Sequence, residues 1–311
     1  MGLRVIAPGP NLETVRPHGL RIDTIRDRVG ALTHEFATAT PFRHAVLDGC
    51  LDIDRRELGS FPDLTWPHWN DLGDTYQHGK RTCQDRAAIP SPWGELIDEL
   101  NAPPFLGLLE QITGIAKLIP DPYLEGGGLH LSAAGGILAP HTDFHVYGRL
   151  GLYRRLNVLV YLNPDWAPGD GGVLTLTHAH HPERGRRQIE PAWGRIVMFE
   201  TNDVSVHGFP EPVGPGRCRR SIATYYYTST ETRGFSGDFT THWRDHGRIR
   251  PRQRLRFWIA RLLMQTSRGF SLLSHLVNPN QGVGWRWRLR APKDQPGPAS
   301  TPGLRRRGSR R

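Results

Sequence analysis

Short apolar runs separated by turn residues fill the middle of the chain, and they restrict the fold more than any other feature. Strands of this length and spacing are typical of an all-β sandwich or barrel and not of a parallel sheet with crossover helices. The double-sheet jelly roll is one of the folds that fit. The runs occupy residues 129–132, 136–139, 155–162, 172–177, 187–190, 195–200 and 219–228.

Helical patterns precede this region. Ser91 and Pro92 are a plausible helix start, and residues 95–100 follow with helical spacing. A second apolar stripe covers residues 105–112 and ends near Gly114. Both helices are expected to pack behind the sheet, so the predicted fold is mainly β with flanking helices.

The remaining segments are less regular. Residues 1–30 are expected to be an irregular or extended lead-in, and residues 42–52 can open the sheet. Residues 58–91, rich in Gly, Pro, Asp and aromatic side chains, are expected to be a long loop region with short elements that borders a site or packs on the surface. Residues 250–277 are expected to contain a helix with an apolar and a basic face.

The net charge of +10 comes from the C-terminal end. Residues 244–311 contain 17 Arg and Lys against 2 Asp and Glu, which leaves 23 basic and 28 acidic residues in 1–243. We therefore expect a domain over 1–243 with its motif-bearing core at about 95–230, a basic helical extension over 244–290 and a disordered Arg-rich tail over 291–311.

His141 and Asp143 stand two residues apart at the end of an apolar run. On an extended strand, residues i and i+2 point to the same face. One imidazole and one carboxylate on one face supply two of the three ligands of a facial triad, the site type of non-haem Fe(II) oxygenases. His207 is the candidate for the third ligand. Such a site leaves positions open for a bidentate 2-oxoacid and O2.

A 2-oxoacid with a second carboxylate would need a cation near the iron. Arg219 follows His207 by 12 residues at the start of the last apolar run. An arginine can bind a carboxylate through two parallel hydrogen bonds. Ser221 shares a strand face with Arg219, so the two can hold one carboxylate together, whereas Arg220 alternates toward solvent.

These motifs together resemble the 2-oxoglutarate- and Fe(II)-dependent dioxygenases, on the prolyl-4-hydroxylase-like side of that superfamily. The resemblance covers roughly residues 95–230 and has the order and spacing of the family. The matching segments are HTDF at 141–144, RLNVLVYLNPDW at 155–166, GGVL at 171–174, FE at 199–200, HGFP at 207–210 and RRSIATYYY at 219–227.

The resemblance implies a double-stranded β-helix, which is a jelly-roll, cupin-like barrel. It implies that His141, Asp143 and His207 bind iron and that Arg219 and Ser221 bind the C5 carboxylate of 2-oxoglutarate. Tyr161 occupies the position of a tyrosine that contacts the same carboxylate, and Asn157, on the same strand face, is expected to line the cosubstrate pocket. The cofactors expected are Fe(II), 2-oxoglutarate and O2, with ascorbate as a supporting reductant.

Other histidines have simpler interpretations. His178, His180 and His181 can form a second metal site, but an exposed polar loop is the more common origin of such a cluster. His145 can face the substrate or pack, and His130 is expected to be structural. Cys50, Cys83 and Cys218 are widely spaced and odd in number, which argues against a disulfide framework.

The predicted function is oxidation of an unactivated C–H bond of a small molecule, with release of succinate and CO2. The acidic balance of residues 1–243 favours a cationic substrate such as an amino-sugar natural product. A protein or peptide prolyl hydroxylase is the alternative within the same chemistry. A nucleic-acid-binding protein is less favoured, because the arginines lie outside the catalytic region. We expect no membrane span and, in the absence of an apolar leader, a cytoplasmic location.

Overall fold

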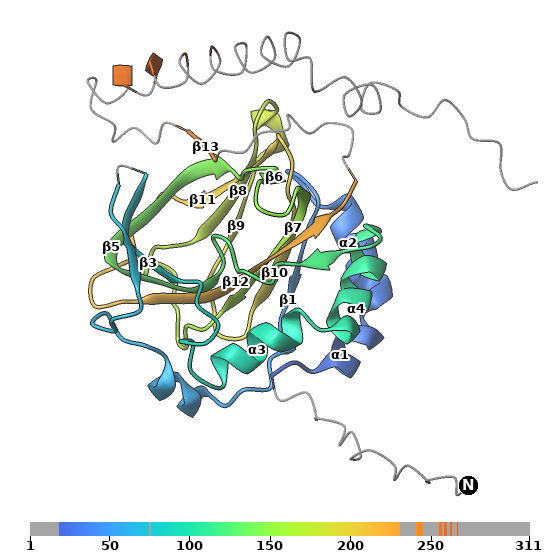
Figure 1. Cartoon of the computed structure of the whole chain (residues 1–311), viewed down its shortest axis with the longest axis horizontal. Coiled ribbons are helices and arrows are strands. Elements are labelled where there is room, and N and C mark those ends of the chain that lie inside the picture. The colour runs from blue at the N-terminus through green and yellow to red at the C-terminus, as the bar shows by residue number, and fades with distance from the viewer. Residues whose placement is uncertain are drawn as a thin grey trace, which may run out of the picture. The chain divides into compact units, whose positions relative to one another are not determined.

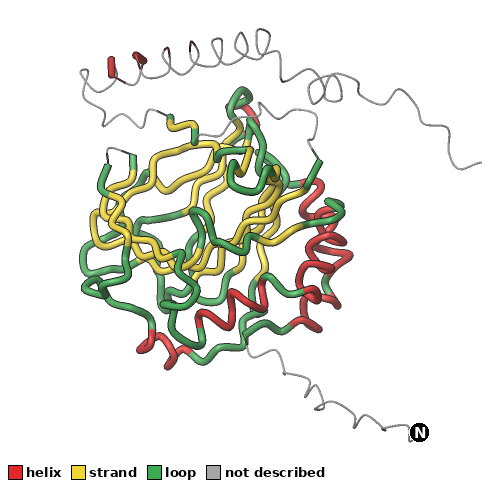
Figure 2. Tube along the Cα trace, in the orientation of Figure 1, coloured by secondary structure: helices red, strands yellow, loops and turns green. Residues whose placement is uncertain are grey.

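The computed structural model describes residues 19–74, 76–230 and 241–244, together with the helical positions 255, 256, 258, 259, 262 and 266. The chain divides into two units, residues 1–248 and 249–311. The first unit is a curled antiparallel sheet with short helices outside it (Figures 1 and 2). The prediction of a mainly β, jelly-roll fold with flanking helices is confirmed.

The strands of the described residues join in a single sheet, in the order β1-β10-β7-β12-β5-β11-β8-β9, with the remaining strands paired at its sides. The strands are β1 (His44–Leu47), β2 (Asn70–Leu72), β3 (Gln77–Cys83), β4 (Ile119–Pro120), β5 (Gly128–Thr142), β6 (Val146–Tyr147), β7 (Leu152–Tyr161), β8 (Leu174–His178), β9 (Arg186–Ile189), β10 (Ile196–Glu200), β11 (Ser205–Phe209), β12 (Arg219–Thr228) and β13 (His242–Trp243).

The 15-residue strand β5 joins the two layers of the curled sheet. Its first half pairs with β12, its second half pairs with β11 and β13, and β3 pairs with both halves. The sequence predicted two separate runs here, over residues 129–132 and 136–139. Gly135 does adopt a positive φ of 79°, but the strand continues through it. A single strand thereby carries residues from one end of the barrel to the metal site.

In the described part of the first unit, four α-helices lie outside the sheet: α1 (Ile22–Asp27), α2 (Val29–Thr38), α3 (Trp93–Leu100) and α4 (Pro103–Thr113). The last two match the helices predicted from the sequence, and Gly114 ends α4 in the left-handed conformation at φ 70°. The irregular lead-in predicted for residues 1–30 is wrong for its described part, which contains α1 and the start of α2. Burial of Ile25 and Leu32 against the sheet stabilises this segment despite β-branched residues that are modest helix formers.

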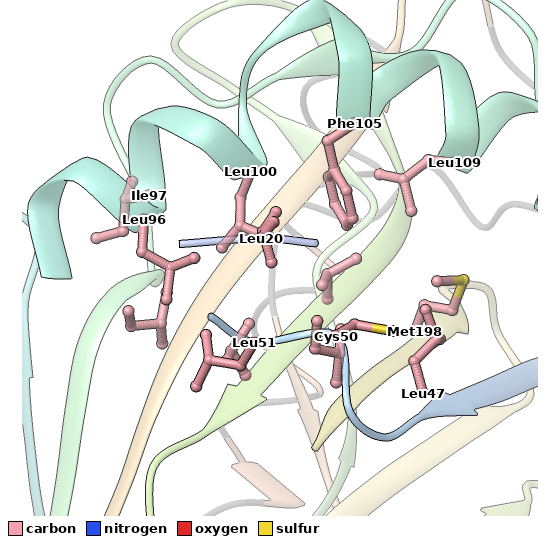
Figure 3. Packing of buried hydrophobic residues seen from close by; sticks show 14 of the residues in the cluster. Leu20, Leu47, Cys50, Leu51, Leu96, Ile97, Leu100, Phe105, Leu109 and Met198 are labelled. Atoms are coloured by element: carbon pink, nitrogen blue, oxygen red, sulfur yellow. The ribbon is translucent and has the colours of Figure 1, made fainter. Parts of the chain in front are cut away.

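The main core fills the space between the helices and the convex face of the sheet. Figure 3 shows side chains of α3 and α4 pointing toward residues from the sheet and from the segment near Leu20. Leu100 is fully buried, and burying a leucine side chain contributes about 1.5–3 kcal/mol. The helices thus hold the sheet from outside and leave its concave face available for a site.

Residues 58–91 are more ordered than the sequence suggested. They contain the strands β2 and β3, and β3 pairs with β5 along both of its halves. The charged and polar side chains of β3 obscured its strand character. The segment therefore forms a wall of the barrel, and the expectation of a loop region with short elements was only partly right.

The second unit is described at six positions, all helical, within the segment predicted to contain a helix. The rest of the predicted extension and the tail lie outside the described residues. In the part of the chain that the structure describes, no helix is both long enough and apolar enough to cross a membrane.

Candidate metal centre and cosubstrate pocket

The three predicted metal ligands meet at one point. His141 near the end of β5 lies directly opposite His207 of β11, and Asp143 follows β5 by one residue. One ligand atom from each residue lies within 4.8 Å of the others, and all three side chains are buried. Two imidazoles and one carboxylate in this arrangement are the donor set of a 2-His-1-carboxylate iron site.

Hydrogen bonds orient both imidazoles. His141 Nδ1 donates to the carbonyl of Ala139 over 2.9 Å, and His207 Nδ1 donates to the carbonyl of Ser205 over 3.1 Å. A carbonyl can only accept, so each ring carries a proton on Nδ1, and in the neutral form of the ring Nε2 is bare. Burial lowers the pKa of His207 to about 3, which keeps the ring neutral. His207 is therefore in the form that binds a metal ion, and the hydrogen bond of His141 orients its Nε2 toward the same point.

The Asp143 carboxylate is held from the neighbouring strand β7. Asn157 Nδ2 donates to its Oδ2 over 2.8 Å, and a guanidinium nitrogen of Arg154 lies 3.0 Å from the same oxygen. Burial alone would raise the pKa of Asp143, but Arg154 helps to hold it well below its usual range. Asn157 lines the pocket as expected from the sequence, and its amide contacts the metal carboxylate.

Arg219 is buried at the other end of the site. Its Nη2 donates to the Tyr161 hydroxyl over 3.0 Å and its Nε donates to the carbonyl of Gly172 over 2.8 Å. Gly172 has a φ of +60°, and a Cβ there would lie 3.1 Å from Arg219 Cδ. Because Gly172 has no Cβ, the Arg219 side chain has the space to pass close to its backbone. Ser221 lies directly opposite Tyr161 in the sheet.

A cavity of about 370 Å³ connects the two ends of the site. His141, Asp143, His207, Asn157, Arg219 and Ser221 all line it. Tyr161 is fully buried behind Arg219 and does not line it, so its hydroxyl acts on the pocket through the guanidinium. The volume lies within the range of small-ligand sites.

Trp243 of β13 closes one side of the metal site. Its ring lies 4.6 Å from that of His141 and stacks on Tyr76 at 5.1 Å and 11°. The strand β13 pairs with the end of β5, so the backbone holds this tryptophan in place. Trp243 was not predicted from the sequence, because a two-residue strand 36 residues after His207 has no recognisable signal.

Three further pocket residues lacked a sequence signal. Arg154 precedes the RLNVLVYLNPDW segment by one residue and resembles a solvent-facing arginine. Lys80 and Thr82 belong to β3, where the sequence predicted a loop region. His130, expected to be structural, lines the cavity. Its Nε2 donates a hydrogen bond to the carbonyl of Gly126, because a carbonyl can only accept.

The other histidines that the structure describes do not form a metal group. His178 Nδ1 lies 3.2 Å from the amides of His180 and His181 and accepts from both, which is a turn interaction. His145 is fully buried, and its Nδ1 lies 3.1 Å from Asp203. Among the described residues, the single group of three His, Cys, Asp or Glu side chains placed to share an ion is the His141–Asp143–His207 triad.

Comparison with known proteins gives the same class. Residues 127–227 match the model of the 2OG-Fe(II) oxygenase superfamily, and this segment contains all three predicted ligands together with Arg219 and Ser221. The resemblance stated from the sequence is confirmed: this segment matches the family of 2-oxoglutarate- and Fe(II)-dependent oxygenases. Fe(II) and 2-oxoglutarate, the cofactors expected from the sequence, fit the buried triad and the pocket.

The individual proteins that this chain is similar to include prolyl hydroxylases and an epimerase. Prolyl 3-hydroxylase OGFOD1 of Xenopus laevis is 32% identical over 77 residues, which cover 24% of this chain and 15% of that protein. The match thus spans a small part of the relative. A prolyl-4-hydroxylase structure from Pseudomonas putida is 21% identical, with a TM-score of 0.44, over 64% of this chain and 98% of that one. The epimerase SnoN from nogalamycin biosynthesis is 16% identical, with a TM-score of 0.44, over 72% and 88%.

Proposed function

We propose that the protein uses Fe(II), 2-oxoglutarate and O2 to oxidise an unactivated C–H bond of a small molecule, by hydroxylation or oxidative ring closure, with release of succinate and CO2. The observation that carries the proposal is the shared cavity: the facial triad and the buried Arg219 line the same space. A metal-binding protein of the same fold without this chemistry would not need a buried cation opposite the triad.

In this proposal His141, Asp143 and His207 bind the ferrous ion. When bound, the ion supplies activation of O2 coupled to decarboxylation of the 2-oxoacid. The two rings contribute neutral Nε2 atoms, and Asp143 contributes an ionised oxygen that Arg154 and Asn157 hold in place. These two residues fix the orientation of the ligand.

Arg219 and Ser221 would bind the far carboxylate of 2-oxoglutarate. Tyr161 fixes the Arg219 guanidinium through its hydroxyl, and the aromatic rings of Tyr161 and Phe209 lie 4.8 and 4.2 Å from the guanidinium carbon. A cation held in a buried, low-dielectric site interacts strongly with an entering carboxylate. Trp243, whose ring lies against that of His141, would exclude water from the reacting end of the cavity.

The cationic amino-sugar substrate predicted from net charge is not part of this proposal. That prediction used all of residues 1–243, whereas a substrate meets only the residues around the cavity. The described residues that line it include three with cationic side chains, Lys80, Arg154 and Arg219, and one with an acidic side chain, Asp143. These charges do not favour a cation.

A protein or peptide prolyl hydroxylase is the second candidate. It is favoured by one observation, the match of 32% identity to a prolyl 3-hydroxylase over 77 residues. The two candidates share the iron and cosubstrate chemistry and differ in what enters the cavity.

The test has two stages. Anaerobic addition of Fe(II) and 2-oxoglutarate should give the visible metal-to-ligand charge-transfer band, and its absence would reject both candidates. Succinate release is then measured with a panel of small metabolites and with a panel of proline-containing peptides. Release stimulated by a metabolite supports the first candidate. Release stimulated by peptides alone, with a hydroxyproline product, replaces it with the second.

We also propose that residues 1–243 form the catalytic domain and that residues 244–311 are not needed for turnover. The residues assigned here to the pocket lie between Asn70 and Trp243. A domain boundary near residue 248 supports the division.

A further inference from the structure

Two rows of side chains cross the concave face of the sheet. In the first row Lys80 of β3 lies opposite Ser132 of β5, which in turn lies opposite Arg219 of β12. Residues directly opposite each other in antiparallel strands share a face. Lys80 therefore points into the same cavity as Arg219, and it lines that cavity.

The second row places Thr82 opposite His130, and His130 opposite Ser221. All three residues line the cavity. The proposed cosubstrate face thus continues across β5 onto β3. Adjacent strands are about 4.8 Å apart, so Lys80 and Arg219 originate from backbones about 10 Å apart and can serve different anionic groups.

Lys80 is a buried cation with few hydrogen-bond partners among the described residues. Its side chain is 9% exposed, and the hydrogen bond found for it is a long one of 3.5 Å to the Gln77 side-chain oxygen. An ammonium group has three donors. Burial, and then the charge of Arg219, lowers the pKa of Lys80 to about 8, so the group still carries its proton at neutral pH.

The charged groups that face Lys80 are Arg219, Asp143, Arg154 and Asp74. Asp143 is paired with Arg154 and is one of the proposed metal ligands. Asp74 accepts hydrogen bonds from the amides of Tyr76 and Gln77. Neither carboxylate forms an ion pair with Lys80 in the structure. An uncompensated buried charge is costly, and residues of this kind are commonly retained for a ligand.

The cosubstrate does not need this cation. In the proposed function the two carboxylates of 2-oxoglutarate are bound by the iron and by Arg219. Arg154 is occupied by Asp143. Lys80 is then the cation left over for a second molecule. The β2–β3 hairpin that carries it also lines the cavity with the amide side chains of Asn70 and Gln77, which can hydrogen-bond a polar ligand.

We propose that Lys80 binds an anionic group, a carboxylate or a phosphate, on the small molecule that the enzyme oxidises. This inference rests on the proposed function, since it assigns the cosubstrate to Arg219 and the iron. It predicts that acidic substrates are preferred over their neutral or cationic analogues.

The experiment measures anion binding to the assembled enzyme. Inorganic phosphate and acetate are titrated separately, by calorimetry, into the full chain saturated with Fe(II) and 2-oxoglutarate under anaerobic conditions. The charge-transfer band confirms that the cosubstrate is bound. The variants are Lys80→Met and a matched control, Arg81→Met, which removes the neighbouring cation from the opposite face of β3, where Arg81 pairs with Asp71 at 3.1 Å.

In the unmodified protein we expect one anion site. The titrated anion that binds more tightly, phosphate or acetate, identifies phosphate or carboxylate as the preferred group. Lys80→Met should weaken this binding about tenfold or more, the loss expected for a hydrogen bond between charged groups. Arg81→Met should change it less than about twofold, and both variants should keep the 2-oxoglutarate affinity.

Two results would overturn the inference while the proposed function stands. One is a normal charge-transfer band with no saturable anion binding in the unmodified protein. The other is a Lys80→Met variant that loses 2-oxoglutarate affinity, which would assign Lys80 to the cosubstrate. A missing band in the unmodified protein would instead overturn the proposed function.

Discussion

The guanidinium of Arg154 lies 3.0 Å from Oδ2 of Asp143, inside the barrel, where Arg154 is only 2% exposed. Its Nε donates to Asn157, and its guanidinium carbon lies 3.4 Å from the centre of the Tyr225 ring. The strand β7 thus supplies a fixed counter-charge to the metal carboxylate. Asp143 remains ionised whether or not an ion is present.

Substitution of Arg154 by Met should destabilise the metal-free protein. Asp143 would be left as a buried carboxylate without its cation, and breaking a buried pair in this way costs about 3–5 kcal/mol. Urea unfolding in the presence of a chelator measures the change. Arg155→Met, at the next position and on the opposite face of β7, is the control and should cost less than Arg154→Met, because it leaves the pair between Arg154 and Asp143 in place. Equal losses in both variants would contradict a special role for Arg154.

Removal of an iron ligand should abolish metal binding. His141→Ala and His207→Ala each take away one of two neutral Nε2 donors, and the remaining pair cannot complete a facial site. Anaerobic Fe(II) binding by equilibrium dialysis provides the measurement, and the charge-transfer band with 2-oxoglutarate should disappear. His178→Ala is the control, because His178 accepts backbone hydrogen bonds in an exposed turn. Retained Fe(II) affinity in either ligand variant would remove that residue from the assignment.

Site residues that share a strand or belong to the family motifs could be predicted from the sequence. His141 and Asp143, or Arg219 and Ser221, occupy alternate positions, and alternation determines the face of each side chain. Residues such as Arg154 and Lys80 reach the site through pairings between distant strands. Nothing local in the sequence specifies that β3 pairs with β5, so a lysine among Gly, Asp and Gln resembles a surface residue.

The assignment of Arg219 to the 2-oxoglutarate carboxylate predicts that its removal weakens cosubstrate binding and leaves Fe(II) binding in place. Arg219→Ala should raise the 2-oxoglutarate concentration needed for half-saturation about tenfold to a hundredfold, since a charged hydrogen-bonding partner is removed from a buried site. Fe(II) affinity should stay within about twofold, because Arg219 contacts no metal ligand. Tyr161→Phe should have a smaller effect of the same kind.

Arg220→Ala is the control for this substitution. Arg220 is the next residue along β12, points away from the cavity and hydrogen-bonds the carbonyl of Cys218. Its removal should leave 2-oxoglutarate dependence unchanged. If Arg219→Ala and Arg220→Ala behave alike, the cosubstrate carboxylate is bound elsewhere.

The C-terminal tail should be dispensable for turnover. Truncation after Pro292 removes a Pro-, Gly- and Arg-rich segment that lies outside the described residues and follows the pocket residue Trp243 by 50 positions. Succinate release by the shortened chain should equal that of the full chain at the same Fe(II) and 2-oxoglutarate concentrations. A loss of turnover without a loss of thermal stability would show that the tail takes part in catalysis or substrate binding.

Lys80 should make the stability of the protein depend on pH. Its folded-state pKa is lowered from 10.5 to about 8, mainly by burial. Between these values the unfolded chain holds the proton and the folded protein does not, so stability rises with pH in this window. The lowering corresponds to about 3 kcal/mol of cost at neutral pH.

Lys80→Met lacks this cost and should therefore be more stable than the unmodified protein at pH 7, with the difference shrinking as the pH approaches 10. Urea unfolding at several pH values between 7 and 9.5 measures the two curves. The comparison between variants cancels the titration of tyrosines, which Lys80→Met leaves in place. A lysine with a purely structural role would give the opposite sign at pH 7, because its removal would destabilise the fold. If the unfolding free energies of the two proteins changed with pH in parallel, Lys80 would be solvated in the folded protein.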